Sequence, residues 1–214
     1  MRIIVFDTET TGLPTNKRPA THGPNNWPHL VSISWVIIQD FIIVKEQTYI
    51  IKPQGWTIPA DSTKIHGITH ELATENGDKL EDVMKEFMAE SFDKMVAHNM
   101  NFDYNVLMNA ILWDLGWTFN GFKQPLLCTM FLAKSACKLP GKWGYKYPKL
   151  SELYFHIFQR MPNPNRLHSS AYDTQILAEC IQHCEWLKST IDLPVIDYSI
   201  SNGGNNQQIF ELEV

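Results

Sequence analysis

The sequence lacks the features that mark secreted and membrane-spanning proteins. It has only four cysteines in 214 residues, and cysteines in a chain that shows no export signal indicate a reducing compartment. No hydrophobic run is long enough to cross a bilayer. The first apolar run, residues 2–6, is too short for anything but a strand. We therefore expect a cytoplasmic protein that does not bind a membrane.

A surplus of positive charge is also absent. The chain has 18 lysines and arginines against 23 acidic residues, a net charge of −5. The whole molecule therefore offers no general electrostatic attraction to nucleic acid, so such binding must use a local patch or bound cations. With 44% hydrophobic residues and no internal repeat, the chain predicts one domain over residues 1–190. The periodicity fades after Ser189, and we expect residues 191–214 to be a partly flexible tail.

A complete set of zinc ligands is missing too. Cys180, His183 and Cys184 resemble half of a zinc site. However, the two cysteines continue the helical stripe of Ile176 and Leu177, so their spacing favours packing in the core.

Runs of β-branched residues and stretches of helical periodicity alternate along the chain. We expect a strand at 2–6 and a hairpin of two strands at 30–38 and 41–51, which together form the antiparallel part of a sheet. Later segments alternate between helix and strand, which indicates an α/β fold with a mixed sheet flanked by helices. The expected segments are an aperiodic loop at 15–29, short helical segments within 61–71, a helix at 79–92, a strand at 95–97, a helix opened by Asp103, a strand at 126–130, a helix at 150–158 and a final helix that contains 173–181.

Four carboxylates stand at the ends of these elements. Asp7 and Glu9 are two residues apart on an extended chain, so their side chains project to the same face. Asp103 and Asp173 each precede the apolar stripe of a helix. Buried like charges repel one another unless cations neutralise them. Hard oxygen ligands in this number suit two Mg²⁺ or Mn²⁺ ions, and such a pair, about 3.5–4 Å apart, promotes phosphodiester cleavage.

A histidine stands close to the last of these carboxylates in the sequence. His168 comes five residues before Asp173, on a loop before the helix, where Ser169 or Ser170 is available as an N-cap. An imidazole suits a general base that deprotonates an attacking water. Taken alone, the segment also fits a helix start whose aspartate complements the helix dipole and whose histidine is incidental.

Three motifs carry a resemblance to a known family. The order FDTETTG, HNMNFD, HSSAYD resembles the three exonuclease motifs of the DEDDh-family 3′→5′ exonucleases. This family includes the proofreading epsilon subunit of bacterial replicative DNA polymerase, ribonuclease T and the mammalian three-prime repair exonucleases. The resemblance spans residues 1–185 and implies a ribonuclease H-like fold with a five-stranded mixed sheet. It also implies metal ligands and a general base at Asp7, Glu9, Asp103, Asp173 and His168.

The same resemblance implies a pocket for the terminal nucleotide. Its residues would be Thr10, Thr11, Gly12, Leu13, His66, Asn99 and Phe102. Two departures from the family pattern stand out: the loop at 15–29 is longer than in compact members, and Cys128-Thr129 replaces an Asp-Thr pair that many relatives have.

One segment concentrates lysines and aromatic residues. Residues 134–149 read KSACKLPGKWGYKYPK, with five lysines and no acidic residue. This composition is typical of a loop that follows a phosphate backbone while aromatic rings stack on bases, although a solvated loop explains it equally well. We predict that Lys142, Trp143 and Lys146 bind the substrate, with support from Lys138, Tyr145 and Lys149.

These observations predict a metal-dependent 3′→5′ exonuclease that hydrolyses single-stranded DNA ends to nucleoside 5′-monophosphates. Two alternatives stay open. One is a 3′→5′ exoribonuclease with the same chemistry, distinguished by how the pocket treats a 2′-hydroxyl. The other is a catalytically silent module that binds nucleic acid or tethers a polymerase. A DNA polymerase is accordingly a candidate partner, and the oligomeric state stays open.

Overall fold

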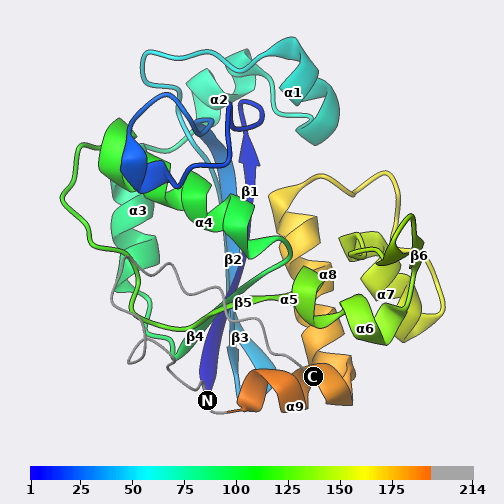
Figure 1. The fold of residues 1–214 in the computed structure, drawn as a ribbon. Helices are drawn as coiled ribbons and strands as arrows, with labels where there is room; N and C mark the ends of the chain where they lie inside the picture. The colour runs from blue at the N-terminus through cyan, green and yellow to red at the C-terminus, as the bar shows by residue number, and fades with distance from the viewer. Residues whose placement is uncertain (194–214) are drawn as a thin grey trace.

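A five-stranded mixed sheet forms the centre of the molecule (Figure 1). The computed structural model describes residues 1–193. The strand order is β3-β2-β1-β4-β5, in which β1, β2 and β3 pair antiparallel and β1, β4 and β5 pair parallel. This arrangement confirms the predicted α/β fold class and the predicted hairpin. The strands are β1 (Arg2–Thr10), β2 (Leu30–Gln39), β3 (Ile42–Ile50), β4 (Lys94–Ala97) and β5 (Leu126–Cys128).

Helices cover both faces of this sheet because β1 and β2 are apolar on both sides. Ile4 and Phe6 of β1 belong to one core, together with residues of α3 (Leu80–Ala89) and α4 (Met100–Asn109). Ile3 and Val5 belong to a second core on the opposite face. This second core also contains residues of α7 (Leu150–Phe158), α8 (Ser170–His183) and α9 (Glu185–Asp192).

Short elements fill the connections between these layers. None of the helices within residues 1–193 is long and apolar enough to cross a lipid bilayer. Cys180 and Cys184 are buried in the second core, as the helical spacing predicted. The short elements are the 3₁₀ turn η1 (Ala20–His22), α1 (Ala60–His66), α2 (His70–Asn76), the π-helical turn η2 (Ala110–Asp114), α5 (Thr129–Leu132), α6 (Lys134–Cys137), β6 (Pro140–Gly141) and β7 (Gly144–Tyr145).

Three local expectations differ from the structure. Helix α4 begins at Met100, so Asp103 lies in its first turn rather than opening it. Strand β5 ends at Cys128, and the residues expected to continue it form α5, whose fully buried Thr129 hydroxyl lies 3.3 Å from the Ala97 carbonyl. Short apolar runs do not distinguish a strand from a buried helical turn, and tertiary contacts decide between them.

The third difference concerns segments expected to be plain loops. Within residues 15–29, Trp27 is buried against Phe102, and the Ala20 backbone N–H donates to the Asn105 side chain. This segment therefore packs on α4. Residues 134–149 contain α6 and a hairpin formed by β6 and β7.

The predicted domain end at residue 190 falls inside α9, whose Ile191 is buried in the second core. Most of the predicted tail, residues 194–214, lies outside the described residues.

Candidate active site

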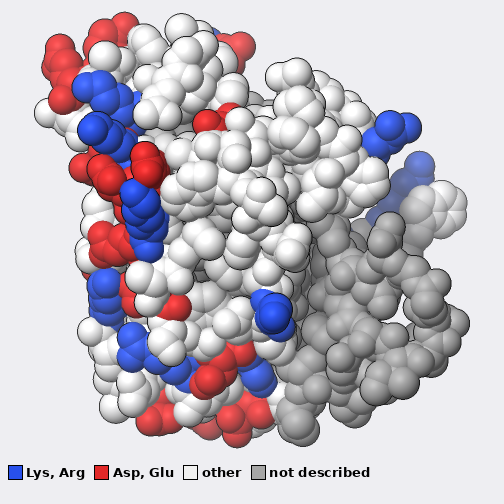
Figure 2. All heavy atoms as spheres, turned by 90° about the vertical axis from the view of Figure 1, so that its left-hand side faces the viewer, with Lys and Arg blue, Asp and Glu red and all other residues white. Residues whose placement is uncertain are grey.

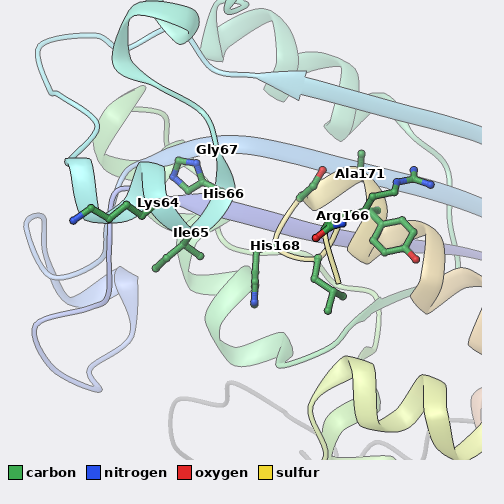
Figure 3. A pocket seen from close by; sticks show the side chains of 11 residues that line it. Lys64, Ile65, His66, Gly67, Arg166, His168 and Ala171 are labelled. Atoms are coloured by element: carbon green, nitrogen blue, oxygen red, sulfur yellow. The ribbon is translucent and has the colours of Figure 1, made fainter. Parts of the chain in front are cut away.

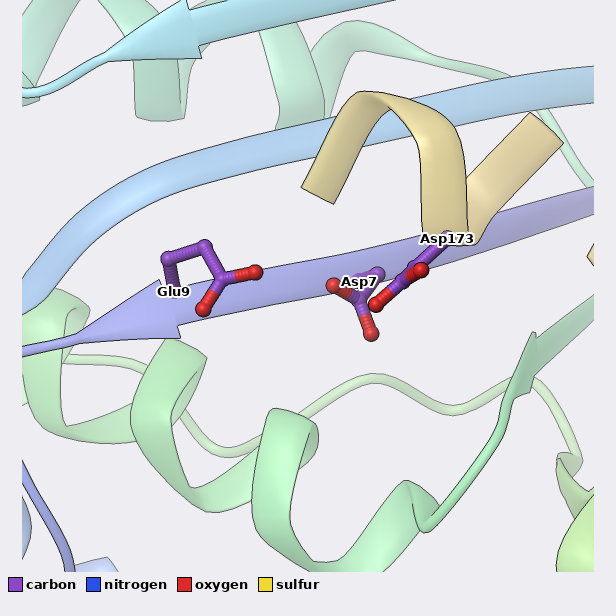
Figure 4. Close-up of side chains that lie close together, drawn as sticks. All are labelled: Asp7, Glu9 and Asp173. Atoms are coloured by element: carbon purple, nitrogen blue, oxygen red, sulfur yellow. The ribbon is translucent and has the colours of Figure 1, made fainter. Parts of the chain in front are cut away.

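Two carboxylates at the end of β1 project from the same face of the sheet. Asp7 pairs with Ser34 of β2 and Glu9 pairs with Ser32, so all four side chains share that face. Asp173, in the first turn of α8, approaches this face from above (Figure 4). Asp7, Glu9 and Asp173 each place one oxygen so that the three atoms lie within 4.8 Å of one another. The structure thus brings Asp173 next to two residues that precede it by 164 and 166 positions.

A layer of hydroxyl groups holds α8 against the sheet at this point. The buried Ser170 Oγ lies 2.7 Å from Ser32 Oγ and 2.8 Å from Ser34 Oγ. Ser34 Oγ in turn lies 2.9 Å from Thr48 Oγ1 on β3. Serine is small enough to let the helix come close, and the buried hydroxyls of Ser32, Ser34 and Ser170 satisfy one another. The layer therefore positions the first turn of α8, and with it Asp173.

The fourth carboxylate comes from the opposite side of β1. Thr8 lies between Asp7 and Glu9 and projects to the face that α4 covers. Its backbone N–H and its hydroxyl donate to Asp103 Oδ1 at 3.0 and 2.8 Å. Asp103 is 97% buried. It is outside the group of three because Thr8 holds it beside the strand.

Burial raises the pKa values of all four carboxyl groups, and repulsion between neighbouring acids adds to the shift at Asp7, Glu9 and Asp103. Burial raises the pKa of Asp7 well above its ordinary value, and Asp103, Glu9 and Asp173 raise it further. Burial, followed by Asp173 and Asp103, raises the pKa of Glu9 from 4.5 to about 8. Burial raises the pKa of Asp103 to about 7 against the lowering effect of the two Thr8 hydrogen bonds. Such a cluster favours protons or cations.

Asp173 is connected to His168 through the backbone. Burial raises the pKa of Asp173 to about 6, although His168 opposes this shift by its charge and by its backbone N–H. That N–H donates to Asp173 Oδ2 at 3.2 Å, whereas the buried Oδ1 has no hydrogen-bond partner. A buried oxygen without a partner is costly and is suited to a cation. This observation shows that the residues present fit divalent metal binding.

His168 is exposed and has a backbone φ of +63°. This left-handed conformation is uncommon outside glycine. His168 is one of the residues that border an open pocket of about 410 Å³ between α1 and the segment before α8 (Figure 3). Lys64, His66 and Gly67 border it on the α1 side, and Arg166 and His168 on the other.

The residues predicted to bind the terminal nucleotide come from the end of β1, from α1 and from the start of α4. Thr10 to Leu13 continue β1 directly after Glu9, and Leu13 is 82% exposed. His66 lies beside the Thr10 backbone and borders the pocket. Asn99 and Phe102 lie at the start of α4 instead, where the Phe102 N–H donates to the Asn99 carbonyl. Lys142, Trp143 and Lys146 lie on the β6–β7 hairpin region and do not border this pocket.

Sequence reasoning missed the residues that position the carboxylates. Thr8 had a readable signal, because the residue between two acids on a strand must face the other way. Ser32 and Ser34 alternate with isoleucine in β2 and stand out as polar residues in a buried strand. Their connection to Ser170 spans more than 130 residues, and no local pattern encodes it.

Comparison with known protein families gives one match that covers most of the chain. A family described as "Exonuclease" matches residues 4–181. DNA polymerase III PolC-type from Thermotoga maritima is 36% identical over 137 residues, which is 64% of this chain. The homologous polymerase from Thermotoga petrophila gives the same values. The chain spans 9% of the length of these polymerases.

Solved structures of exonucleases have the same fold. Exonuclease X, solved in complex with 5′ overhanging duplex DNA, superimposes with a TM-score of 0.59 at 25% identity, over 88% of this chain and 92% of that one. E. coli exonuclease I in complex with a dT13 oligonucleotide gives a TM-score of 0.65 at 11% identity, over 89% of this chain and 42% of that one. The second likeness concerns the fold alone.

Proposed function

Because the chain belongs to the exonuclease family, we propose that it is a 3′→5′ exonuclease that shortens single-stranded DNA to nucleoside 5′-monophosphates. The observation that carries this proposal is the convergence of Asp7, Glu9 and Asp173 within 4.8 Å, with His168 joined to Asp173. A structural protein would gain nothing from buried carboxylates that repel one another. A nuclease needs them for cations.

Two divalent cations, Mg²⁺ or Mn²⁺, would be held by Asp7, Glu9, Asp103 and Asp173. When bound, such a pair stabilises negative charge on both the attacking and the leaving oxygen of a phosphodiester. The protein itself supplies fixed positions for the four carboxylates. Thr8 orients Asp103, and the hydroxyl layer around Ser170 orients α8. Positions fixed before the substrate binds are what an oriented displacement at phosphorus requires.

His168 is the proposed general base. Its backbone N–H donates to Asp173 Oδ2. This hydrogen bond fixes the backbone that carries the imidazole next to the cluster. Its ring is exposed and can exchange the proton that it takes from the attacking water. A base of this kind contributes roughly 10²–10⁴-fold to the rate.

The terminal nucleotide is proposed to lie next to the cluster, between two groups of residues. Thr10 to Leu13 and His66 would form one side, and Asn99 and Phe102 the other. The exposed Leu13 and the half-buried Phe102 are the apolar surfaces on which a base would pack.

DNA is proposed in preference to RNA because exonuclease X was solved with DNA and the sequence relatives are DNA polymerases. The same relatives make a DNA polymerase the proposed protein partner. The exoribonuclease remains the alternative within this chemistry. The silent binding module is disfavoured because all five motif residues are present.

The test is digestion of matched 5′-labelled single-stranded DNA and RNA, with Mg²⁺ and then with Mn²⁺. We expect a ladder that shortens from the 3′ end, faster on DNA, and no products with EDTA. Asp7→Asn serves as the control for a contaminating nuclease. Faster digestion of RNA would favour the exoribonuclease. Absence of products with either polymer and either metal would refute an exonuclease activity.

A further inference from the structure

The segment 134–149 is an isolated patch of positive charge on an acidic protein. It holds five lysines and no acid, while the whole chain carries −5. Elsewhere several lysines form ion pairs: Lys45 binds Glu86 and Glu90, and Lys85 binds Glu81. Figure 2 shows basic and acidic side chains intermixed on the face at the left of Figure 1. The segment 134–149 lies on the other side of the molecule, around α6 and β6 (Figure 1).

The base of this segment is rigidly attached. The Tyr147 ring packs edge-on against Phe131 at 4.8 Å between centroids, and Lys134 Nζ lies 4.6 Å from the Tyr147 ring. Lys146, which we predicted to bind substrate, forms an ion pair of 2.5 Å with Glu152 on α7. Its charge therefore holds the hairpin on the protein, so it is less available to a ligand than the charge of Lys142.

The tip of the hairpin, by contrast, presents an aromatic ring and a cation to solvent. Trp143 is 90% exposed, the largest exposed fraction among the large hydrophobic side chains of residues 1–193. Lys142 Nζ lies 5.4 Å from its ring centroid. A flat aromatic surface next to an ammonium group matches the base and the phosphate of a single-stranded nucleotide, because every base has a face on which an indole can stack.

The hairpin is also connected to the active site. The Pro148 carbonyl, two residues before α7, accepts a hydrogen bond of 3.0 Å from His98 Nε2. His98 follows β4 and precedes Asn99, the N-cap of the helix that carries Asp103. This hydrogen bond joins the end of the segment 134–149 to the residues just before α4, the helix that carries Asp103.

We propose that the hairpin tip, through Trp143 and Lys142, binds single-stranded nucleic acid upstream of the 3′ end that enters the active site. A base stacks on Trp143 while the adjacent phosphate pairs with Lys142. The proposal rests on the proposed function for the direction of the strand. The binding chemistry itself does not depend on cleavage.

The experiment compares Trp143→Ala, Trp143→Phe and Lys142→Ala with Lys123→Ala, an exposed lysine between η2 and β5. Binding of a 5′-fluorescein 20-mer of deoxythymidine is followed by anisotropy in EDTA, and kcat/KM is measured with Mg²⁺ for the 20-mer and for a dinucleotide. We expect Trp143→Ala to weaken 20-mer binding about five- to tenfold, with Trp143→Phe near wild type. Lys142→Ala should reduce the slope of log Kd against log salt by about 0.7, the value of one single-strand phosphate contact.

In the hydrolysis assay, the ratio of kcat/KM for the 20-mer to that for the dinucleotide should fall in Trp143→Ala and stay unchanged in Lys123→Ala. Equal loss on both substrates would place the hairpin at the reacting phosphate and overturn the proposal. Wild-type binding by both tip variants would also overturn it and leave the tip to a protein partner or to solvent. If the wild type cleaves neither substrate but binding still depends on Trp143, the exonuclease proposal fails while this surface stands.

Discussion

Replacing Glu9 with Gln removes one negative charge from the carboxylate cluster and keeps the shape of the side chain. Burial and neighbouring acids raise the pKa of Glu9 from 4.5 to about 8. In the metal-free protein, the Glu9 carboxyl therefore stays protonated in the folded state at pH values at which it is ionised in the unfolded chain. The stability of the wild type falls as the pH rises from 4.5 to about 8, since the unfolded state releases its proton first.

The size of the effect follows from the same pKa values. One pKa unit corresponds to about 1.4 kcal/mol, so at pH 6.5, two units above 4.5, the penalty on wild-type Glu9 is about 2–3 kcal/mol. Glu9→Gln, which stays neutral, should be more stable by this amount at pH 6.5 in EDTA. For a chain of this length the unfolding midpoint should rise by about 4–12 °C.

The assay is thermal or urea unfolding of both proteins in EDTA at several pH values between 4.5 and 8. Glu75→Gln is the matched control, because Glu75 is exposed on α2 and its replacement changes the net charge equally. The advantage of Glu9→Gln should vanish near pH 4.5. Saturating Mg²⁺ should reduce or reverse it, because a ligand at 100 times its Kd stabilises the intact site by about 2.7 kcal/mol. A gain that does not change with pH, or one equal to that of Glu75→Gln, would refute the repulsion argument.

Three further predictions concern single residues. Asp7→Ala should abolish hydrolysis of single-stranded DNA yet unfold at or above the wild-type temperature in EDTA; near-wild-type turnover in the purified variant would exclude the proposed metal site. His168→Ala should lower kcat by about 10²–10⁴ with metal binding measured by calorimetry little changed, and recovery of the rate in excess metal would contradict the base role. Ser170→Ala should raise the Mg²⁺ concentration needed for half-maximal activity several-fold, because the first turn of α8 loses two hydrogen bonds. Ser170→Thr, which keeps the hydroxyl, should recover part of that loss, and an equal Mg²⁺ requirement in all three proteins would show that the layer is only structural.

Local patterns along the chain were enough to predict most of the elements and the positions of the four carboxylates on them. Alternation along β1 places Asp7 and Glu9 on one face, because successive strand residues point to opposite sides. Helical spacing places Asp103 and Asp173 at the starts of α4 and α8. These are local consequences of backbone geometry, so the fold class and the placement of the four carboxylates on their elements were readable from the chain alone.

The local endings of elements were less predictable. The start of α4, the end of β5 and the structure within residues 134–149 depend on which partners the chain meets after folding. Cys128 and Thr129, for example, belong to one short apolar run, yet one ends a strand and the other begins a helix.

Contacts between distant segments determine how the carboxylates are held and which lysines of residues 1–193 form ion pairs. The contact between Ser170 and the two serines of β2 joins residues more than 130 positions apart. The ion pair between Lys146 and Glu152 attaches the hairpin to α7, so this lysine serves the structure of the protein. Hydrogen bonds and ion pairs form between groups that packing brings within about 3 Å, whereas composition only counts those groups. The arrangement of the site therefore follows from the way α8 and the hairpin pack against the rest of the protein.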